Sequence, residues 1–493
     1  MRFEEIMPES LIVPLVSAKY LDRPAAVAPL PRKDGPVMVR FVAPNTDTLK
    51  QIHVYERVGD SWRAVGDGTR PRTVSGGQAA VAVVPAVPTI LGPLSDRFTV
   101  SLTKPDGKSL GVVPCRVAPI LLASSLDPVV SVFVVKSALS EKFVGELARL
   151  LPKCDGKPTL TAIAPVTVPH DLWMQDTTEI GVCAVPDGRG VKQIPVPFGG
   201  LRGKHEGIKT DALDQTVRDH FAADANYVPV QAAESRPNTR WIDWFGNLEV
   251  SPPVPGFPHG RVLTGFQKEL RFHPDLIAFL EAQKLQCPPL YLDVSWLTIG
   301  HVDELINFVP ARGGKGFRAL LPSPALATAI LEKAVKDGHG GSPVFAGTKQ
   351  ETTVSKLLAE VAGTSETRAI ETSLRETRKK LATELQLSPD DIVSLPVLFK
   401  DGLAVIPNGV NSLVIGRDVI IPAPNGPRIG KTDPFEDAIR ERFHPLGLRS
   451  HFIDIHEPYH VRSGEIHCGT NAVRRLKNPR WWTRDSRSQN SGV

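Results

Sequence analysis

Three separate stretches of this chain carry side chains that together could break a carbon–nitrogen bond. The stretches are residues 173–176 (WMQD), 300–304 (GHVDE) and 464–471 (GEIHCGTN). They supply one thiol from Cys468, one imidazole from His301, and two carboxylates from Asp176 and Asp303. A thiolate can add to the central carbon of a guanidinium, an imidazole can move protons, and two carboxylates can hold the positive nitrogens. The set therefore predicts nucleophilic attack on a guanidinium-like carbon.

Each of these residues also has an ordinary structural explanation. Small and polar residues after Cys468 leave its sulfur reachable, yet most free cysteines are buried structural thiols. His301 and Asp303 are two residues apart and would share one face of a strand, but a lone histidine is more often a core or turn residue. Trp173 could stack on the stem of a guanidinium that Asp176 binds, or be a core residue beside a turn-forming acid. The residues alone leave both explanations open.

Oxygen ligands for a hard cation occur near the same stretches. Gln175 and Glu179 are four residues apart, and Glu249 ends the run FGNLE. Calcium takes roughly six to eight oxygens, some of them from backbone carbonyls. The chain has no D-x-D-x-D-G calcium loop, and such acids are also common at surfaces and helix caps. The residues alone therefore leave the metal open.

Two motifs imitate other chemistries. Residues 456–460 (HEPYH) match the HExxH zinc-protease pattern, which requires both histidines on one helical turn. Pro458 interrupts that turn, and the preceding residues 452–455 read as a strand. Residues 426–432 (GPRIGKT) resemble a phosphate-binding loop but are one residue short and contain a proline. We therefore reject both the zinc site and the phosphate loop.

Composition narrows the functional classes. The 493 residues, 41% hydrophobic and 23% charged, predict a globular protein of two to four domains. A net charge of +5 gives no polyelectrolyte signal, so the basic residues 474–487 read as a solvated tail and we expect no nucleic-acid partner. No apolar run is long enough for a membrane span. Five cysteines without CxxC spacing argue against a disulfide framework, and reduced thiols favour the cytoplasm, with secretion and the oligomeric state left open.

The periodicity changes along the chain. Short alternating runs at 37–42, 51–55, 79–84 and 98–102, separated by Gly, Pro and Asp turns, predict a small β-sandwich. After residue 119, strands alternate with amphipathic helices, which predicts an α/β domain. The expected strands are 129–135, 413–415 and 419–421, and the expected helices are 140–151, 211–221, 274–285, 325–336, 352–386 (interrupted at Gly363) and 435–443. The predicted organisation is a Pro-rich lead-in (1–35), the sandwich (36–118), the α/β domain (119–483) and a disordered tail (484–493). A ring of similar modules would suit the size of the α/β domain, but no sequence repeat demonstrates one.

Longer motifs around the same residues resemble those of peptidyl-arginine deiminases over about residues 115–482. The motifs are residues 173–181 (WMQDTTEIG), 245–253 (FGNLEVSPP), 296–310 (WLTIGHVDELINFVP), 315–318 (KGFR) and 464–471. Five long motifs in the same order are highly specific. The resemblance implies a pentein fold, a five-bladed α/β propeller with the active site at its centre. Here the propeller would follow a single β-sandwich of immunoglobulin or cupredoxin type.

The resemblance also implies an activity and residue roles. The enzyme would be a hydrolase that converts peptidyl-arginine in proteins or peptides to peptidyl-citrulline and releases ammonia. Cys468 would be the nucleophile that forms a thiouronium, His301 the general acid and base, and Asp176 and Asp303 the guanidinium-binding pair. Substrate-binding roles are implied for Trp173 on the arginine stem, Arg202 on the peptide backbone and Arg462 at the pocket mouth.

One calcium site near the catalytic residues is implied by the same motifs. Its ligands would be Gln175, Glu179 and Glu249 with the backbone carbonyls of Phe245 and Leu248. Thr177 stands where the animal enzymes carry an acid, and Pro197 and Phe198 stand where they carry further ligands. We therefore expect at most one calcium, with activation weaker than in the animal enzymes or absent.

Two other functions remain in competition. A pentein hydrolase could act on a free small guanidine such as arginine, agmatine or methylarginine, although such relatives usually lack a β-sandwich and the run FGNLEVSPPV. A non-catalytic scaffold is the other alternative, and the complete set of thiol, imidazole and carboxylates argues against it.

Overall fold

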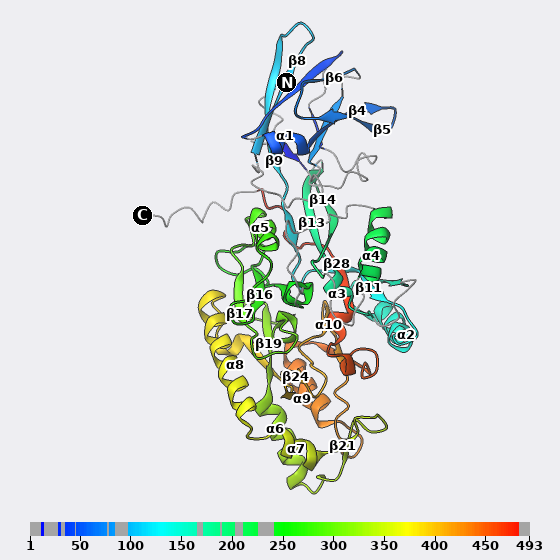
Figure 1. The fold of residues 1–493 in the computed structure, drawn as a ribbon, viewed down its shortest axis with the longest axis vertical. Coiled ribbons are helices and arrows are strands. Elements are labelled where there is room, and N and C mark those ends of the chain that lie inside the picture. Colours follow the sequence, from blue (N-terminus) through cyan, green and yellow to red (C-terminus); the bar gives the residue numbers. More distant parts are fainter. Residues whose placement is uncertain are drawn as a thin grey trace.

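The computed structural model describes residues 11–13, 28–30, 35–44, 46–75, 78–83, 97–164, 171–187, 190–202, 211–224 and 241–482. The tail predicted over residues 484–493 lies outside the described residues. Figure 1 shows the N-terminal sheets at one end of the long axis and α7 at the opposite end, with α3, α10 and β28 between them.

Two sheets form the N-terminal part. The first contains β1 (Leu11–Val13), β9 (Ser109–Val117), β8 (Arg97–Thr103), β3 (Val37–Val42) and β6 (Arg72–Val74), in that order. The second contains β2 (Ala28–Pro29), β7 (Ala79–Val83), β4 (Ile52–Val58) and β5 (Ser61–Asp67), with the short helix α1 (Thr46–Gln51) ahead of β4. Alternation along β3 buries Val37, Val39 and Phe41, and both sheets contribute to one apolar core. Strands β1 and β2 lie within the range predicted as a lead-in.

The remaining strands form five separate three-stranded sheets and two small hairpins. In spatial order the sheets are β10 (Ile120–Leu122), β13 (Thr178–Asp187), β14 (Gly190–Gly199); β12 (Thr159–Ile163), β11 (Val129–Val135), β28 (Thr470–Arg474); β15 (Leu248–Val250), β16 (Val262–Phe266), β17 (Leu290–Asp293); β18 (Asn307–Pro310), β19 (Phe317–Ser323), β22 (Ile392–Pro396); and β25 (Leu413–Ile415), β26 (Asp418–Pro422), β27 (Arg449–Ile453). The hairpins are β20 (Pro343–Val344) with β21 (Thr352–Thr353), and β23 (Phe399–Lys400) with β24 (Leu403–Ala404). These strands and the helices between them confirm the predicted α/β character.

Four of the five sheets repeat one pattern. Their central strands β11, β16, β19 and β26 each have one parallel and one antiparallel neighbour. Helices join each central strand to its parallel neighbour, as parallel pairing requires. These helices are α2 (Glu141–Leu150), α5 (Pro274–Ala282), α6 (Pro324–Lys336) with α7 (Val354–Val361) and α8 (Ser365–Glu384), and α9 (Pro434–Phe443). The repeat exists in the backbone although the sequence shows none.

The sheet around β11 is completed by the end of the described chain. Its antiparallel neighbour β28 comes from residues 470–474, whereas β11 and β12 come from residues 129–163. The remaining sheet, around β13, has two antiparallel neighbours and precedes α4 (Asp211–Asp224).

Local sequence explains where the helices begin and end. In α9, the Asp433 side chain accepts a hydrogen bond from the backbone N–H of Phe435, and Pro434 occupies the first turn. Phe435, Ile439 and Phe443 follow at helical spacing and are buried. The predicted interruption of the region 352–386 is confirmed, since Gly363 has a φ of +64° between α7 and α8. No helix in the described part of the chain is both long and apolar enough to span a bilayer.

Candidate active site

A short turn or loop precedes one strand of each three-stranded sheet, and these five segments carry the polar residues of the candidate site. They are α3 (Met174–Thr177) before β13, the turn Phe245–Asn247 before β15, the turn Val302–Glu304 before β18, the loop 408–412 before β25, and α10 (Ile466–Gly469) before β28. Pairing within each sheet therefore positions residues that are up to about three hundred positions apart in sequence.

Cys468 lies in α10 with a buried sulfur. The Asn411 side-chain nitrogen Nδ2 donates to this sulfur across 3.1 Å, and the thiol lies 3.3 Å from Oδ2 of Asp303. Burial, followed by the negative charges of Asp303 and Asp176, raises the pKa of the Cys468 thiol well above its usual value. The resting sulfur is therefore a thiol, and it needs added positive charge or hydrogen-bond donors to become a nucleophile.

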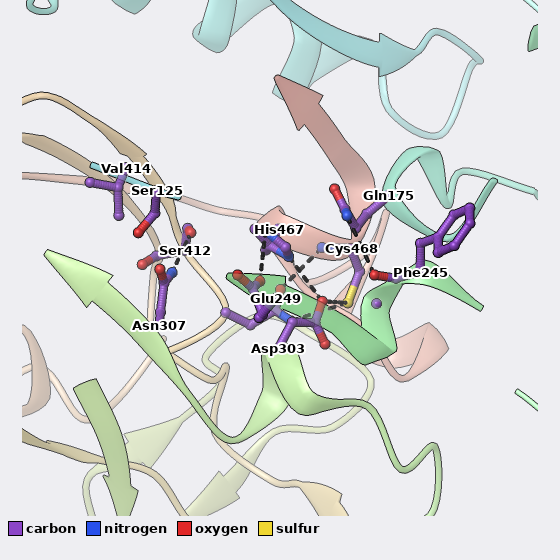
Figure 2. Close-up of polar contacts among 12 residues, drawn as sticks. Ser125, Gln175, Phe245, Glu249, Asp303, Asn307, Ser412, Val414, His467 and Cys468 are labelled. Carbon is purple, nitrogen blue, oxygen red and sulfur yellow. Dashed lines mark hydrogen bonds and ion pairs between the residues drawn. The ribbon is translucent and has the colours of Figure 1, made fainter. Parts of the chain in front are cut away.

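Asp303 connects the thiol to a second histidine. Its Oδ2 lies 3.0 Å from Nδ1 of His467 as well as next to the sulfur, and Figure 2 shows Asp303 between these two side chains. Its other oxygen, Oδ1, is buried and accepts no hydrogen bond from any described residue. A buried, unpaired carboxylate oxygen is costly, so this atom is suited to a cationic ligand.

His301 and Asp176 form the opposite part of the site. Nε2 of His301 lies 2.7 Å from the backbone carbonyl of Trp241, which can only accept, so Nε2 carries a proton. Nδ1 lies 3.6 Å from Oδ1 of Asp176 and makes no hydrogen bond with a described residue. The backbone N–H of Gly246 donates to the same Asp176 oxygen across 3.0 Å. His301 is thus held by one ring nitrogen while the other is available for proton transfer.

The surroundings make Asp176 a poor anion without a ligand. Burial raises the pKa of Asp176 to about 6, although His301 acts in the opposite direction. Sequence reasoning placed His301 and Asp303 on a strand, and that premise is wrong because both belong to the turn that begins at His301. The predicted proximity nevertheless holds: Cys468, His301, Asp303 and Asp176 come together.

A pocket opens beside these groups. It is lined by Trp173, Asp176, Trp241, Trp244, Ile299, His301, Arg462, Ser463, Gly464 and Cys468. A Cβ atom at Gly464 would lie 2.4 Å from the ring of Trp173, so this glycine allows the indole to approach the backbone before Cys468. Three indoles and an exposed guanidinium, that of Arg462, give a largely apolar slot with a polar edge. Trp173 and Arg462 therefore lie where the resemblance implied.

Arg202 is a different case. It is 1% exposed and does not line the pocket. Its guanidinium pairs with Asp171 and with Asp214 at 2.8 Å, and lies 4.9 Å from the ring centre of Trp244. The predicted contact with a substrate backbone does not fit this placement, because both carboxylates hold the guanidinium within the interior. Arg202 instead positions Trp244, whose indole N–H donates to the Arg202 carbonyl across 3.2 Å.

The residues predicted to bind calcium meet in a neighbouring polar cavity. Gln175, Glu179, Leu248 and Glu249 line it together with His467. The Gln175 amide nitrogen lies 2.8 Å from Oε2 of Glu179 and 3.4 Å from the carbonyl of Phe245. Burial raises the pKa of Glu179, and it raises the pKa of Glu249 to about 7. Two buried carboxylates with an amide and carbonyls nearby have the chemistry that a hard cation requires, so the donor set fits calcium.

His467 links the two cavities and was given no role from the sequence. Its Nε2 lies 3.2 Å from Oε1 of Glu249, and its Nδ1 contacts Asp303, as Figure 2 shows. Burial acts to lower the pKa of His467, but the carboxylates of Glu249 and Asp303 outweigh it and raise the pKa to about 9. Sequence reasoning had directed this side chain away from Cys468 on a strand, whereas α10 is helical.

Asn411 was also missed, although its loop occupies the same position relative to β25 as the other four segments occupy relative to their strands. That equivalence is a property of the sheets, and only the topology reveals it.

Comparison with known proteins agrees with this site. A model of the family described as "Protein-arginine deiminase (PAD)" matches residues 109–483. Mouse protein-arginine deiminase type-4 is 36% identical over 389 residues, which are 75% of this chain and 56% of that protein. Human protein-arginine deiminase type-3 is 35% identical over 384 residues, 74% of this chain and 56% of that protein. The chain thus spans just over half the length of these relatives.

Among solved structures, agmatine deiminase of Enterococcus faecalis aligns with 73% of this chain and 96% of its own, at 12% identity and a TM-score of 0.42. That likeness is too low to identify a fold. The family match covers most of the chain and includes every residue of the candidate site, and so this chain belongs to the protein-arginine deiminase family.

Proposed function

We propose that this protein hydrolyses peptidyl-arginine to peptidyl-citrulline and ammonia. One observation carries the proposal: a buried thiol shares a site with two carboxylates and an imidazole whose outward atoms lack partners. Oδ1 of Asp303 and Nδ1 of His301 are both buried without a hydrogen bond from the described residues. A guanidinium has N–H donors for the carboxylates and a carbon for the sulfur to attack.

The proposed reaction begins with Cys468 deprotonated and His301 protonated. The sulfur adds to the guanidinium carbon, and the adduct expels one nitrogen as ammonia, which takes its proton from His301. Water then adds to the carbon of the resulting thiouronium while His301 accepts a proton. The carbon–sulfur bond breaks, its electron pair returns to the sulfur, and a proton leaves to the solvent. Peptidyl-arginine and water thus give peptidyl-citrulline and ammonium, and the side chain loses one positive charge.

The carboxylates supply much of the catalysis in this scheme. A guanidinium carbon is a poor electrophile, and holding its charge between Asp176 and Asp303 stabilises the attacked cation in a site with little water. The indole of Trp173 would pack along the aliphatic stem, and Arg462 would shape the pocket mouth. We propose arginine-containing proteins or peptides as substrates, because the pocket opens beside an exposed cationic residue that could meet a peptide carbonyl.

We propose at most one calcium, in the polar cavity next to the catalytic pocket. Gln175, Glu179 and Glu249 would offer side-chain oxygens, and Phe245 and Leu248 would offer backbone carbonyls. Bound there, calcium would supply positive charge beside His467 and the turn that carries Asp303. The chain itself holds these acids in place, and His467 already balances part of their charge. We therefore propose weak or absent calcium activation.

We also propose that the five three-stranded sheets are the blades of a closed pentein propeller, and that the two N-terminal sheets are an immunoglobulin- or cupredoxin-like sandwich over 36–118. Support comes from the shared strand pattern of four sheets and from the pairing of β28 with β11, which joins distant parts of the chain. Five free cysteines suit a reducing compartment, and we propose the cytoplasm.

Ammonia release from benzoyl-arginine ethyl ester and from free arginine tests the function. We expect ammonia from the blocked arginine only, with a small response to a calcium chelator. Ammonia only from free arginine would favour a hydrolase of small guanidines. Ammonia from neither, with the same result for agmatine, would favour a non-catalytic scaffold and refute the proposal. Cys468→Ala serves as the blank.

A further inference from the structure

The structure assigns a catalytic role to Asn411: we propose that its side-chain amide donates a hydrogen bond to the Cys468 sulfur and stabilises the thiolate that attacks the substrate. This inference rests on the proposed role of Cys468 as the nucleophile. Neither the family match nor the motifs of the sequence point to this residue.

The orientation of the Asn411 amide is fixed by its two contacts with one residue. Nδ2 lies 3.1 Å from the Cys468 sulfur, and Oδ1 lies 3.2 Å from the Cys468 backbone nitrogen. A backbone N–H can only donate, so the amide oxygen must face it. The NH₂ group must then face the sulfur. The usual ambiguity between amide oxygen and nitrogen is therefore absent at this position.

The loop that carries Asn411 is held before any substrate arrives. The Asn307 amide donates to the carbonyls of Val410 and Ser412 across 3.0 and 2.8 Å, and Figure 2 shows Asn307 beside Ser412. The Asn408 amide donates across 2.7 Å to the carbonyl of Glu304, in the same turn as Asp303. Asn411 itself is 1% exposed. A donor fixed in this way pays no reorganisation cost when negative charge develops on the sulfur.

The charges around the sulfur make a donor necessary. The titratable groups around it are Asp176, His301, Asp303, Glu304, Tyr459 and His467. The acids disfavour a thiolate, and the two histidines make their polar contacts with other groups. The backbone of Glu465 favours the thiolate. Among the described residues, only Asn411 brings a side-chain donor within hydrogen-bond distance of the sulfur.

The topology gives an independent reason. Four of the five segments that precede a strand of each three-stranded sheet carry Asp176, Glu249 at the start of its strand, Asp303 and Cys468. Asn411 occupies the corresponding place before β25. The fifth segment therefore contributes to the same site as the other four.

The test uses Asn411→Asp, because it removes only the proposed interaction. Aspartate keeps an oxygen for the Cys468 backbone N–H but replaces the donor at the sulfur with a second acceptor. The measurement is the rate at which iodoacetamide alkylates Cys468, followed by mass spectrometry from mildly acidic to alkaline pH. In this reaction the thiol proton goes to the buffer, a carbon–sulfur bond forms and iodide leaves. Asn478→Asp, at an exposed position, is the matched control.

We expect Asn411→Asp to slow alkylation at neutral pH by about ten- to a hundred-fold, the usual effect of losing a hydrogen bond to a charged group. The pH at which the rate rises should move upward, and kcat should fall while KM stays nearly constant, since Asn411 does not line the pocket. Alkylation equal to that of the unmodified protein would overturn the proposal and leave Asn411 a loop-positioning residue. Should Asn411→Asp fail to fold, Asn411→Ala is judged by the same criterion.

Alkylation needs no arginine substrate, so the two proposals can fail separately. A protein that releases no ammonia from any guanidine but still shows the Asn411 effect would refute the proposed function alone. An active deiminase whose Cys468 is alkylated equally fast in Asn411→Asp would refute this inference alone.

Discussion

Gly246→Ala should disable the active site without removing any catalytic side chain. Gly246 lies in the turn Phe245–Asn247, and its missing side chain leaves room where His301 and Asp176 meet. A Cβ atom built there would lie 2.3 Å from Nδ1 of His301 and 2.7 Å from Oδ1 of Asp176. Its φ is not positive, so alanine suits the backbone itself. The clash therefore acts on these two side chains alone.

The expected size of the effect follows from these distances. Ordinary contacts begin at 3.4 Å, so the imidazole must retreat by about 1 Å. A displacement of about 1 Å in a catalytic group typically lowers the rate by about a hundred-fold. The hydrogen bond from the Gly246 N–H to Asp176 can survive, because the backbone need not move. We expect kcat to fall by about two orders of magnitude and the fold to persist.

The assay is ammonia release from benzoyl-arginine ethyl ester, with iodoacetamide alkylation showing that Cys468 is still present and accessible. The control is Gly145→Ala in α2, where a Cβ meets nothing within 4 Å. This change should leave kcat unaltered and stabilise the helix by up to about 1 kcal/mol. A folded Gly246→Ala protein with kcat within about two-fold of the unmodified enzyme would show that the spacing of His301 and Asp176 does not limit the reaction, and the assigned roles would have to be abandoned.

Three further predictions concern single residues. Cys468→Ala should abolish turnover and keep the melting temperature within a few degrees, and any activity above the blank would contradict the nucleophile assignment. Glu249→Ala should weaken calcium binding measured by calorimetry and raise the calcium needed for activity, whereas unchanged binding would remove the metal assignment. Because the pKa of Asp176 is raised to about 6, kcat/KM should fall as the pH drops through that value. A raised pKa also means that the folded state is penalised once the pH exceeds it, so Asp176→Asn should stabilise the fold above pH 6 by up to about 3 kcal/mol and give no gain near pH 4. Equal denaturation midpoints at both pH values would refute this sign.

Local patterns predicted the elements that local interactions determine. The strand 129–135 and the helix ending at Phe443 are confirmed, because apolar spacing and capping residues lie within each segment. The four catalytic residues were identified from their chemistry and from the family motifs. Their mutual distances depend on pairings between distant strands, such as β28 with β11, and no single sequence displays such pairings.

The errors have the same origin. Arg202 was expected at the substrate because its buried partners Asp171 and Asp214 cannot be recognised from sequence spacing. Asn411 and His467 were missed because an amide, and a histidine beside the nucleophile, have many ordinary uses. Their roles depend on which atoms they face, and the sheets decide that.

The charge of the site explains both binding and release. Asp176 and Asp303 are buried, and Oδ1 of Asp303 lacks a partner among the described residues, so the empty pocket carries an electrostatic cost. An arginine side chain relieves that cost because it brings a positive charge and several N–H donors. Citrulline retains a similar shape but is neutral, so the proposed reaction removes the charge that favoured binding. The same carboxylates that hold the substrate therefore favour departure of the product, and neutral analogues of arginine should bind far more weakly than cationic ones.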